Sequence, residues 1–239
     1  MTFRTAVRKN VREIPWLGTK AATLSRLPRK LSFPGSQNYW EARYAQGGTS
    51  GNGSEGVLAR FKAEVLNSFV QQHDVASVIE FGCGDGRQLT LAKYPRYLGL
   101  DISRTGLRQA MTLFAGDPTK SFMQYDSRHF RDDARFLTAD LSMSLDVIYH
   151  LVEDEIYLLH LDHLFSSARR FVILYTSDSC EFAASGYTPP HVRHRPVTLD
   201  VTERFPEWQV RQKINNPYPY VGGSGTNTSF ANFLIYEPR

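Results

Sequence analysis

The stretch VIEFGCGDGRQLTLAKYPRYLGLDIS, residues 78–103, decides the fold. A short apolar run ends at Glu80, and the glycine-rich turn GCGDG follows it directly. A second apolar run ends at Asp101, 19 residues after Gly82. Glycines permit a tight turn and close approach of a ligand, and an acid at this later position commonly accepts hydrogen bonds from ribose hydroxyls. The stretch therefore predicts a strand, a ligand-binding turn and a second strand.

The spacing of the glycines narrows the kind of ligand. Gly82, Gly84 and Gly86 form G-x-G-x-G, which differs from the G-x-G-x-x-G that brings a pyrophosphate to a helix N-terminus. The acid immediately before the turn, Glu80, would repel a pyrophosphate but would suit an ammonium group. A glycine-rich turn alone is weak evidence, since turns use glycine everywhere. Its combination with flanking strands and a terminal aspartate is more specific.

The pattern continues outward as strands that alternate with helices. This alternation predicts an α/β fold with a doubly wound, mostly parallel sheet of seven strands, covered on both faces. Two late strands are expected to pair as an antiparallel C-terminal edge. The expected strands are 76–82, 97–103, 121–126, 139–148, 170–178, 207–215 and 229–238, and the expected helices are 57–70, 87–95, 104–116 and 153–168.

Charge divides the 239 residues unevenly. The formal charge is +4, but residues 1–34 hold eight basic residues and one acidic residue, which leaves −3 for residues 35–239. We therefore predict a basic N-terminal arm over 1–38 and one domain over 39–239, with no nucleic-acid partner. No apolar run is long enough to span a membrane, and a cytoplasmic location is expected. Contact of the arm with a membrane surface and a homodimer are both left open.

The motifs around the glycine-rich turn resemble those of the class I S-adenosylmethionine-dependent methyltransferases. The resemblance covers about residues 39–175 and implies a Rossmann-like fold that binds S-adenosylmethionine and releases S-adenosylhomocysteine. It implies that Gly82 and Gly84 approach the methionine part and that Glu80 lies near its amino group. Asp101 would bind the ribose, and Ile102 would border the adenine. The alternative is an α/β nucleotide-binding domain of another kind.

The segment SLDVIYHLVEDE, residues 144–155, carries the candidate catalytic chemistry. Asp146 ends the fourth expected strand and is counted with the cofactor-binding residues. If a helix follows it, His150, Glu153 and Asp154 share one face. A histidine near neutral pKa can take a proton from a hydroxyl, which makes His150 the candidate base.

The acids of this segment also suggest a metal site. Asp126, Glu153 and Asp154 would give Mg²⁺ the oxygen ligands it prefers, and the metal would orient a sugar diol. The same acids are compatible with roles that need no metal, because acids favour the first turn of a helix and Asp126 could accept a hydrogen bond from adenine. His150 could also simply close a loop.

A narrower resemblance links four stretches to bacterial sugar O-methyltransferases of polysaccharide biosynthesis, such as the mycobacterial methylmannose polysaccharide 1-O-methyltransferase. It implies a sugar or oligosaccharide acceptor, with His150 as the base and Mg²⁺ as a second cofactor. The stretches are 39–70, 78–89, 143–155 and HVRHR at 191–195.

Two further segments are candidates for contact with the ligands. Trp40, Arg43 and Tyr44 lie on a short expected helix that could cover the cofactor, with Arg43 reaching its carboxylate. An amphipathic helix that packs on the sheet fits the same residues equally well. The loop 186–195 could form a polar rim that binds acceptor hydroxyls or an anionic group, but a solvated loop explains its residues slightly better. Competing functions are a metal-independent O- or N-methyltransferase of another small molecule, a nucleic-acid amino-methyltransferase and a non-catalytic cofactor-binding protein. The nucleic-acid class is disfavoured, because DVIYHL stands where an N/D-P-P-Y/F motif is expected.

Overall fold

The computed structural model describes residues 33–179, 189–220 and 227–239. The chain divides into two units, Met1–Pro34 and Gly35–Arg239, and the second contains the sheet and the helices. Residues 1–32 of the predicted basic arm lie outside the described residues, as do residues 186–188 of the loop 186–195. The arm's boundary at residue 38 therefore stays a prediction.

A seven-stranded sheet forms the centre of the fold, in the order β3-β2-β1-β4-β5-β7-β6. Strands β1 to β5 are parallel, and β7 runs antiparallel to both β5 and β6. This arrangement confirms the predicted α/β sheet with an antiparallel C-terminal edge. The strands are β1 (Val78–Phe81), β2 (Tyr97–Asp101), β3 (Lys120–Gln124), β4 (Ala139–Leu145), β5 (Ala168–Thr176), β6 (Trp208–Ile214) and β7 (Asn232–Pro238).

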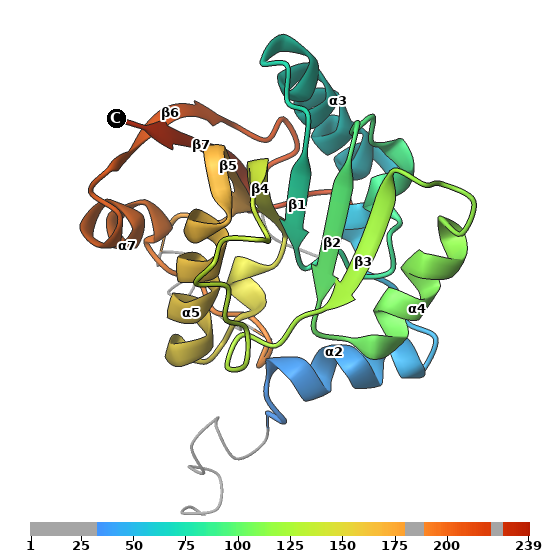
Figure 1. Cartoon of the computed structure of the whole chain (residues 1–239). Coiled ribbons are helices and arrows are strands. Elements are labelled where there is room, and N and C mark those ends of the chain that lie inside the picture. Colours follow the sequence, from blue (N-terminus) through green and yellow to red (C-terminus); the bar gives the residue numbers. More distant parts are fainter. Residues whose placement is uncertain (1–32, 180–188, 221–226) are drawn as a thin grey trace, which may run out of the picture. The chain divides into compact units, whose positions relative to one another are not determined.

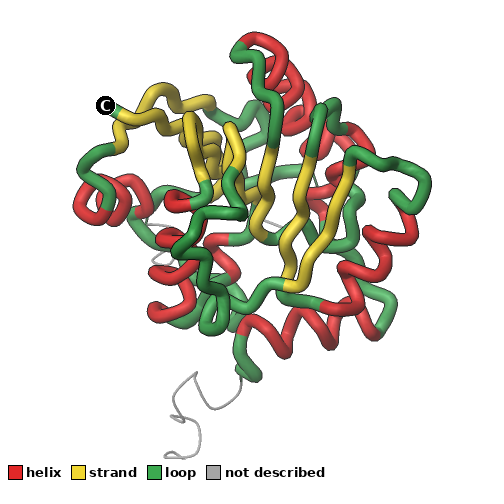
Figure 2. The backbone as a smooth tube through the Cα atoms, viewed as in Figure 1, coloured by secondary structure: helices red, strands yellow, loops and turns green. Residues whose placement is uncertain are grey.

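Helices cover both faces of this sheet. Figure 1 shows α3 and α4 on one side of the strands and α5 and α7 on the other, and Figure 2 shows the loops that join them. Among the described helices, none is both long and apolar enough to cross a membrane. The helices are α2 (Ser36–Ala45), α3 (Gly56–Gln72), α4 (Arg104–Leu113), α5 (Asp154–Ser166) and α7 (Val197–Arg204), with short 3₁₀ turns η2 (Asn52–Ser54), η3 (Gln88–Leu91) and η4 (Ile148–His150).

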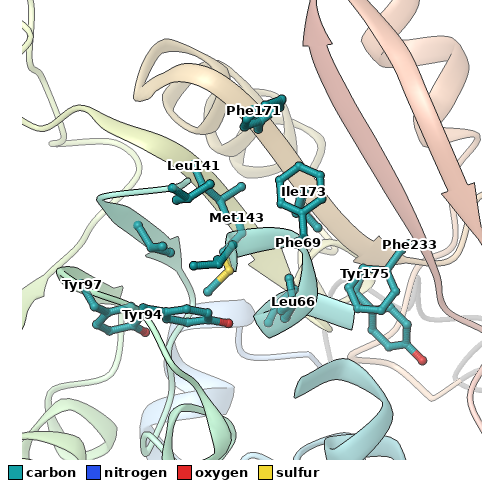
Figure 3. Packing of buried hydrophobic residues seen from close by; sticks show 14 of the residues in the cluster. Leu66, Phe69, Tyr94, Tyr97, Leu141, Met143, Phe171, Ile173, Tyr175 and Phe233 are labelled. Atoms are coloured by element: carbon teal, nitrogen blue, oxygen red, sulfur yellow. The ribbon is translucent and has the colours of Figure 1, made fainter. Parts of the chain in front are cut away.

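Two apolar cores lie on the two faces because alternate residues of a strand point to opposite sides. In β5, Ile173 joins the core under α3, whereas the neighbouring Val172 and Leu174 join the core under α5 and α7. Figure 3 shows the first core, in which aromatic and aliphatic side chains from the sheet meet those of α3. Its labelled members are Leu66, Phe69, Tyr94, Tyr97, Leu141, Met143, Phe171, Ile173, Tyr175 and Phe233.

The connection between β1 and β2 differs from the prediction. The expected helix over 87–95 is only the single turn η3. Asn67 of α3 accepts a hydrogen bond from the amide of Lys93 at 2.8 Å and donates one to the carbonyl of Leu91 at 2.9 Å. The side chain of Asn67 thus takes the place of a helical hydrogen-bond partner for these two backbone groups. Pro95 follows, and a proline disfavours helical geometry in the residue before it.

A second difference is α7, which the sequence pattern did not predict. Its eight residues follow Pro196, and Val197 and Val201 are buried against α5 and the sheet. At the start of the helix, Asp178 accepts hydrogen bonds from the amide and the hydroxyl of Thr198, at 2.7 and 2.5 Å. The start of the helix is thus capped by a carboxylate 20 residues earlier in the chain. Local periodicity of apolar residues cannot predict such a contact.

Candidate functional site

The glycine-rich turn follows β1 at the carboxyl edge of the sheet, where ligands bind in doubly wound folds. Gly82 and Gly84 have φ of 94° and 57°, which only glycine adopts without strain. A Cβ on Gly82 would strike the side chain of Val147, and one on Gly84 would lie 2.6 Å from the hydroxyl of Tyr44. The turn therefore requires glycine both for its backbone and for the side chains packed against it.

Asp101 ends β2 beside this turn and is buried. Its Oδ2 accepts a hydrogen bond from the amide of Gly84 at 2.7 Å, and its Oδ1 accepts one from the amide of Ser103 at 2.8 Å. Burial raises the pKa of Asp101 to about 6 despite these two bonds. A carboxylate has about four acceptor sites, so Asp101 retains some capacity to accept a hydrogen bond from a diol. Ile102 follows directly and is half-buried.

Glu80 lies within β1 and is 4% exposed. The hydroxyl of Tyr97 donates a 2.6 Å hydrogen bond to its Oε2. Burial raises the pKa of Glu80 to about 7, although Tyr97 and the charge of Lys62 pull it down. An acid at this pKa is only partly ionised near neutral pH. A cationic ligand nearby would favour its charged form.

Helix α2 and the segment after it form a strap, residues 36–54, beside the glycine-rich turn. Figure 1 shows the carboxyl ends of β2 and β3 pointing toward α2. Glu41 joins the strap to the start of α4, where it accepts hydrogen bonds from the hydroxyls of Ser103 at 2.7 Å and Thr105 at 2.6 Å. Ser36 donates to Glu153 through its amide at 3.0 Å and through its hydroxyl at 2.7 Å.

The far end of the strap is held against the glycine-rich turn. The hydroxyl of Ser50 donates to Oδ1 of Asp85 at 2.7 Å and lies 3.0 Å from the hydroxyl of Tyr44. Arg43, predicted to reach the cofactor, donates from Nε to the carbonyl of Thr49 at 2.7 Å and lies over the ring of Trp40 at 5.6 Å. The strap therefore covers Gly84, and Arg43 braces the strap in this structure.

Asp146 follows β4 and has a partner that the sequence pattern did not reveal. The ammonium of Lys62 lies 2.5 Å from Oδ2 of Asp146, and the lysine side chain is 1% exposed. The hydroxyl of Tyr149 donates to Oδ1 at 2.7 Å. Lys62 stands among the apolar residues of α3. A lysine on the apolar face of an expected helix is the feature of the sequence that could have indicated a buried ion pair. Asp146 has φ of 59°, an unusual conformation for a residue other than glycine.

His150 ends the 3₁₀ turn η4, and its ring lies among other aromatic rings. Its Nδ1 donates to the carbonyl of His191 at 3.0 Å, which leaves the lone pair on Nε2. No partner for Nε2 occurs in the part of the chain that the structure describes. Trp40 meets the ring edge-on at 4.9 Å, and His191 stacks at 5.4 Å. Burial lowers the pKa of His150 to about 4, so the near-neutral pKa expected from the sequence is not found. The ring is neutral at pH 7 and can accept a proton, but it is a weaker base than an exposed histidine.

The predicted metal ligands are not brought together. Asp126 accepts from His129 at 2.9 Å, and Asp154 pairs with Arg193 at 2.9 Å. Glu153 accepts hydrogen bonds from Ser36 of the strap. Across residues 33–179, 189–220 and 227–239, no group of three or more His, Cys, Asp or Glu side chains is placed to hold a metal ion.

The shared helical face predicted for His150, Glu153 and Asp154 does not form either. The segment folds as the separate turn η4, and α5 begins only at Asp154. The extended backbone of Glu153 at the start of α5 separates the two elements.

The chemistry of the strand ends fits S-adenosylmethionine. Asp101 offers a buried acceptor for a ribose diol, and Glu80 is a buried acid to which no lysine or arginine of the described residues is hydrogen-bonded. The glycine-rich turn supplies close backbone approach. These residues would hold the ribose and the ammonium of the cofactor, while the side chains of Tyr44 and Ser50 lie where the strap meets Gly84.

Comparison with solved structures establishes the fold. A SAM-dependent methyltransferase from Anabaena variabilis matches with a TM-score of 0.59 and 17% identity over 85% of this chain and 93% of that chain. The methyltransferase domain of bacterial CtHen1 matches at 0.56 and 18% identity over 74% and 96%. The magnesium protoporphyrin IX methyltransferase of Synechocystis matches at 0.54 and 17% identity over 75% and 83%. The chain thus has the class I methyltransferase fold.

Similarity in sequence covers less of the chain than similarity in structure. No family model matches the chain. The small RNA 2'-O-methyltransferase of Arabidopsis thaliana is 29% identical over 109 residues, which are 41% of this chain and 12% of that protein. These comparisons lend no support to the narrower resemblance to sugar O-methyltransferases. They include methyltransferases named for RNA, so they do not support the expected exclusion of nucleic acid.

Proposed function

We propose that this protein transfers a methyl group from S-adenosylmethionine to a hydroxyl of a sugar ring, with His150 as the general base. The observation that carries the proposal is one edge of the sheet, where β2, β1 and β4 are neighbours. Asp101 ends β2, Glu80 lies in β1 just before the glycine-rich turn, and His150 follows β4 with no partner for Nε2 among the described residues. The class I methyltransferase fold supports the same cofactor.

The protein's own residues would divide the work between binding and proton transfer. When bound, the cofactor supplies an electrophilic methyl group. Asp101 would hold its ribose, and Glu80 its ammonium. Nε2 of His150 would take the proton of the acceptor hydroxyl as the oxygen forms its bond to the methyl carbon and the carbon–sulfur bond breaks. The carbonyl of His191 fixes the tautomer that leaves Nε2 able to accept this proton.

Aromatic rings around His150 support a ring-shaped acceptor. Tyr39 stacks on His191 with centroids 4.5 Å apart, and Trp40 contacts both Tyr39 and His150. The rings of Tyr39, Trp40 and His191 are each half-buried, so part of each faces solvent. Such faces pack against the apolar face of a sugar or stack on a nucleobase.

The second candidate acceptor is the ribose of an RNA. The resemblance to the Arabidopsis small RNA 2'-O-methyltransferase over 109 residues favours it. The guanidinium of Arg43, above the ring of Trp40, would suit a phosphate beside a stacked base. An oligosaccharide remains the first candidate because the body of the chain is mildly acidic, and phosphate binding favours a basic surface.

A two-stage experiment tests the proposal. S-adenosylhomocysteine at saturating concentration should raise the melting temperature, and the absence of a shift would contradict the cofactor assignment. A methyl-transfer screen, read by mass, should then compare neutral mono- and oligosaccharides with short RNA oligonucleotides. A mass gain of one methyl on a carbohydrate supports the first acceptor, and a gain on the RNA alone supports the second. Methylation of neither class, with the cofactor bound, would overturn the hydroxyl-transfer assignment.

A further inference from the structure

A buried lysine on α3 has no role in the chemistry described so far. Lys62 is 1% exposed and stands on the helix face that packs against the sheet. Lysines are almost never fully buried unless they are paired. Its ammonium lies 2.5 Å from Oδ2 of Asp146 and 5.4 Å from the ring centroid of Tyr175. The lysine therefore brings a positive charge under the carboxyl end of β4.

The carboxylate that receives this charge stands at a strained corner. Asp146 has φ of 59° where β4 turns away from the sheet, and a non-glycine residue persists there only if its surroundings hold it. Lys62 binds one carboxylate oxygen and the hydroxyl of Tyr149 binds the other. Gly53 of the strap packs on the same carboxylate, since a Cβ there would lie 2.7 Å from Oδ2.

The corner leads directly to the proposed base. His150 follows Tyr149, and the two rings lie 4.5 Å apart. A chain of contacts therefore runs from Lys62 through Asp146 and Tyr149 to the imidazole. We propose that Lys62 is a positioning residue, which fixes the corner at Asp146 and thereby holds His150 where its Nδ1–H meets the carbonyl of His191, the contact that sets its tautomer. The catalytic part of this inference rests on the proposed function, whereas the effect on the tautomer does not.

Stability alone does not explain this ion pair well. Replacing a buried ion pair by apolar residues of similar size is often neutral or stabilising, so packing does not require these charges. An aliphatic side chain at Lys62 would fill the same space under the sheet. It would not hold the carboxylate of Asp146 at the strained corner.

Spectroscopy of the cofactor-free protein gives the first test. The ¹⁵N shifts of the His150 ring should report the Nδ1–H tautomer in the wild type and in Arg60→Met, an exposed control on the same helix. Lys62→Met should lose this single tautomer. Tyr149→Phe breaks the next contact without leaving a buried charge alone, and it should show the same loss if Lys62→Met does not fold. An unchanged tautomer in whichever of these variants folds would overturn the proposal.

Kinetics give the second test once an acceptor is known. Lys62→Met should lower kcat about 10- to 100-fold, and the loss should disappear when His150 is already alanine, because groups that act as a unit are non-additive. If the two losses multiply in the double variant, Lys62 acts independently of His150 and the positioning role fails. If the wild type does not bind S-adenosylhomocysteine, the proposed function is contradicted. The tautomer test still applies, because it uses the cofactor-free protein.

Discussion

The hydroxyl of Tyr97 donates a 2.6 Å hydrogen bond to Glu80, a buried acid in the strand that precedes the glycine-rich turn. This is the one hydrogen bond that the described residues give to the Glu80 carboxylate. Burial nevertheless raises the pKa of Glu80 to about 7. The acid is therefore costly for the cofactor-free protein, which is consistent with a role in binding a cation.

Glu80→Gln should separate stability from cofactor binding. The amide oxygen can still accept from Tyr97, and no charge remains to be desolvated, so the variant should be more stable than the wild type at pH 8. Its affinity for S-adenosylhomocysteine should fall about 10-fold or more, because a charge-assisted hydrogen bond to the ammonium is lost. Chemical denaturation and calorimetry check the two effects. A variant that binds as tightly as the wild type would contradict the ammonium assignment.

The stability of the cofactor-free protein should depend on pH through two buried acids. Glu80 and Asp101 have folded-state pKa values of about 7 and about 6, against ordinary values of 4.5 and 3.8. A raised acid stabilises the folded state below its ordinary pKa, and this contribution is lost as pH rises through the folded value. The free energy of unfolding should therefore fall between about pH 4 and pH 7 on their account. Denaturation curves at pH 4.5, 6 and 8 measure this decrease. In Glu80→Gln, the part of the decrease between about pH 6 and pH 7 should be absent.

His150→Ala should lower kcat about 10²- to 10⁴-fold, the usual range for a lost general base. Affinity for S-adenosylhomocysteine should change little, because no assigned cofactor contact is removed. The pKa of about 4 keeps the ring neutral from pH 6 to pH 8, so protonation of His150 should not limit kcat in that range. The exposed His129 provides the control, since His129→Ala should retain activity. A full kcat in His150→Ala would remove the base assignment.

Asp126→Asn should leave methyl transfer within about threefold of the wild type, as is usual for a surface substitution. The side chain accepts from His129 at 2.9 Å and from the amide of Arg128 at 3.0 Å, and it does not meet Glu153 or Asp154 at a common site. Activity measured across a Mg²⁺ titration should respond alike in variant and wild type. A selective loss of Mg²⁺ response in the variant would restore Asp126 as a ligand.

Local patterns predicted the parts of the fold that depend on short-range order. Alternating apolar runs predicted the strands of the mixed sheet, and the glycines predicted the turn after β1. The helix expected over 87–95 failed because Asn67, distant in sequence, pairs with its backbone groups. The shared face predicted for His150 and Glu153 failed because the backbone leaves helical geometry at Leu151 and α5 begins only at Asp154.

The amino-acid sequence by itself determined the α/β sheet, its antiparallel edge and the placement of Glu80, Asp101 and Asp146 at or next to the carboxyl ends of their strands. Periodicity and turn residues are local properties, so they can be followed along the chain. Only the tertiary structure decided which acidic side chain pairs with which basic side chain. It paired Asp146 with Lys62, 84 residues away, and Asp154 with Arg195, 41 residues away. Such pairs form because packing brings distant elements together, and a buried charge then requires whichever partner lies within reach.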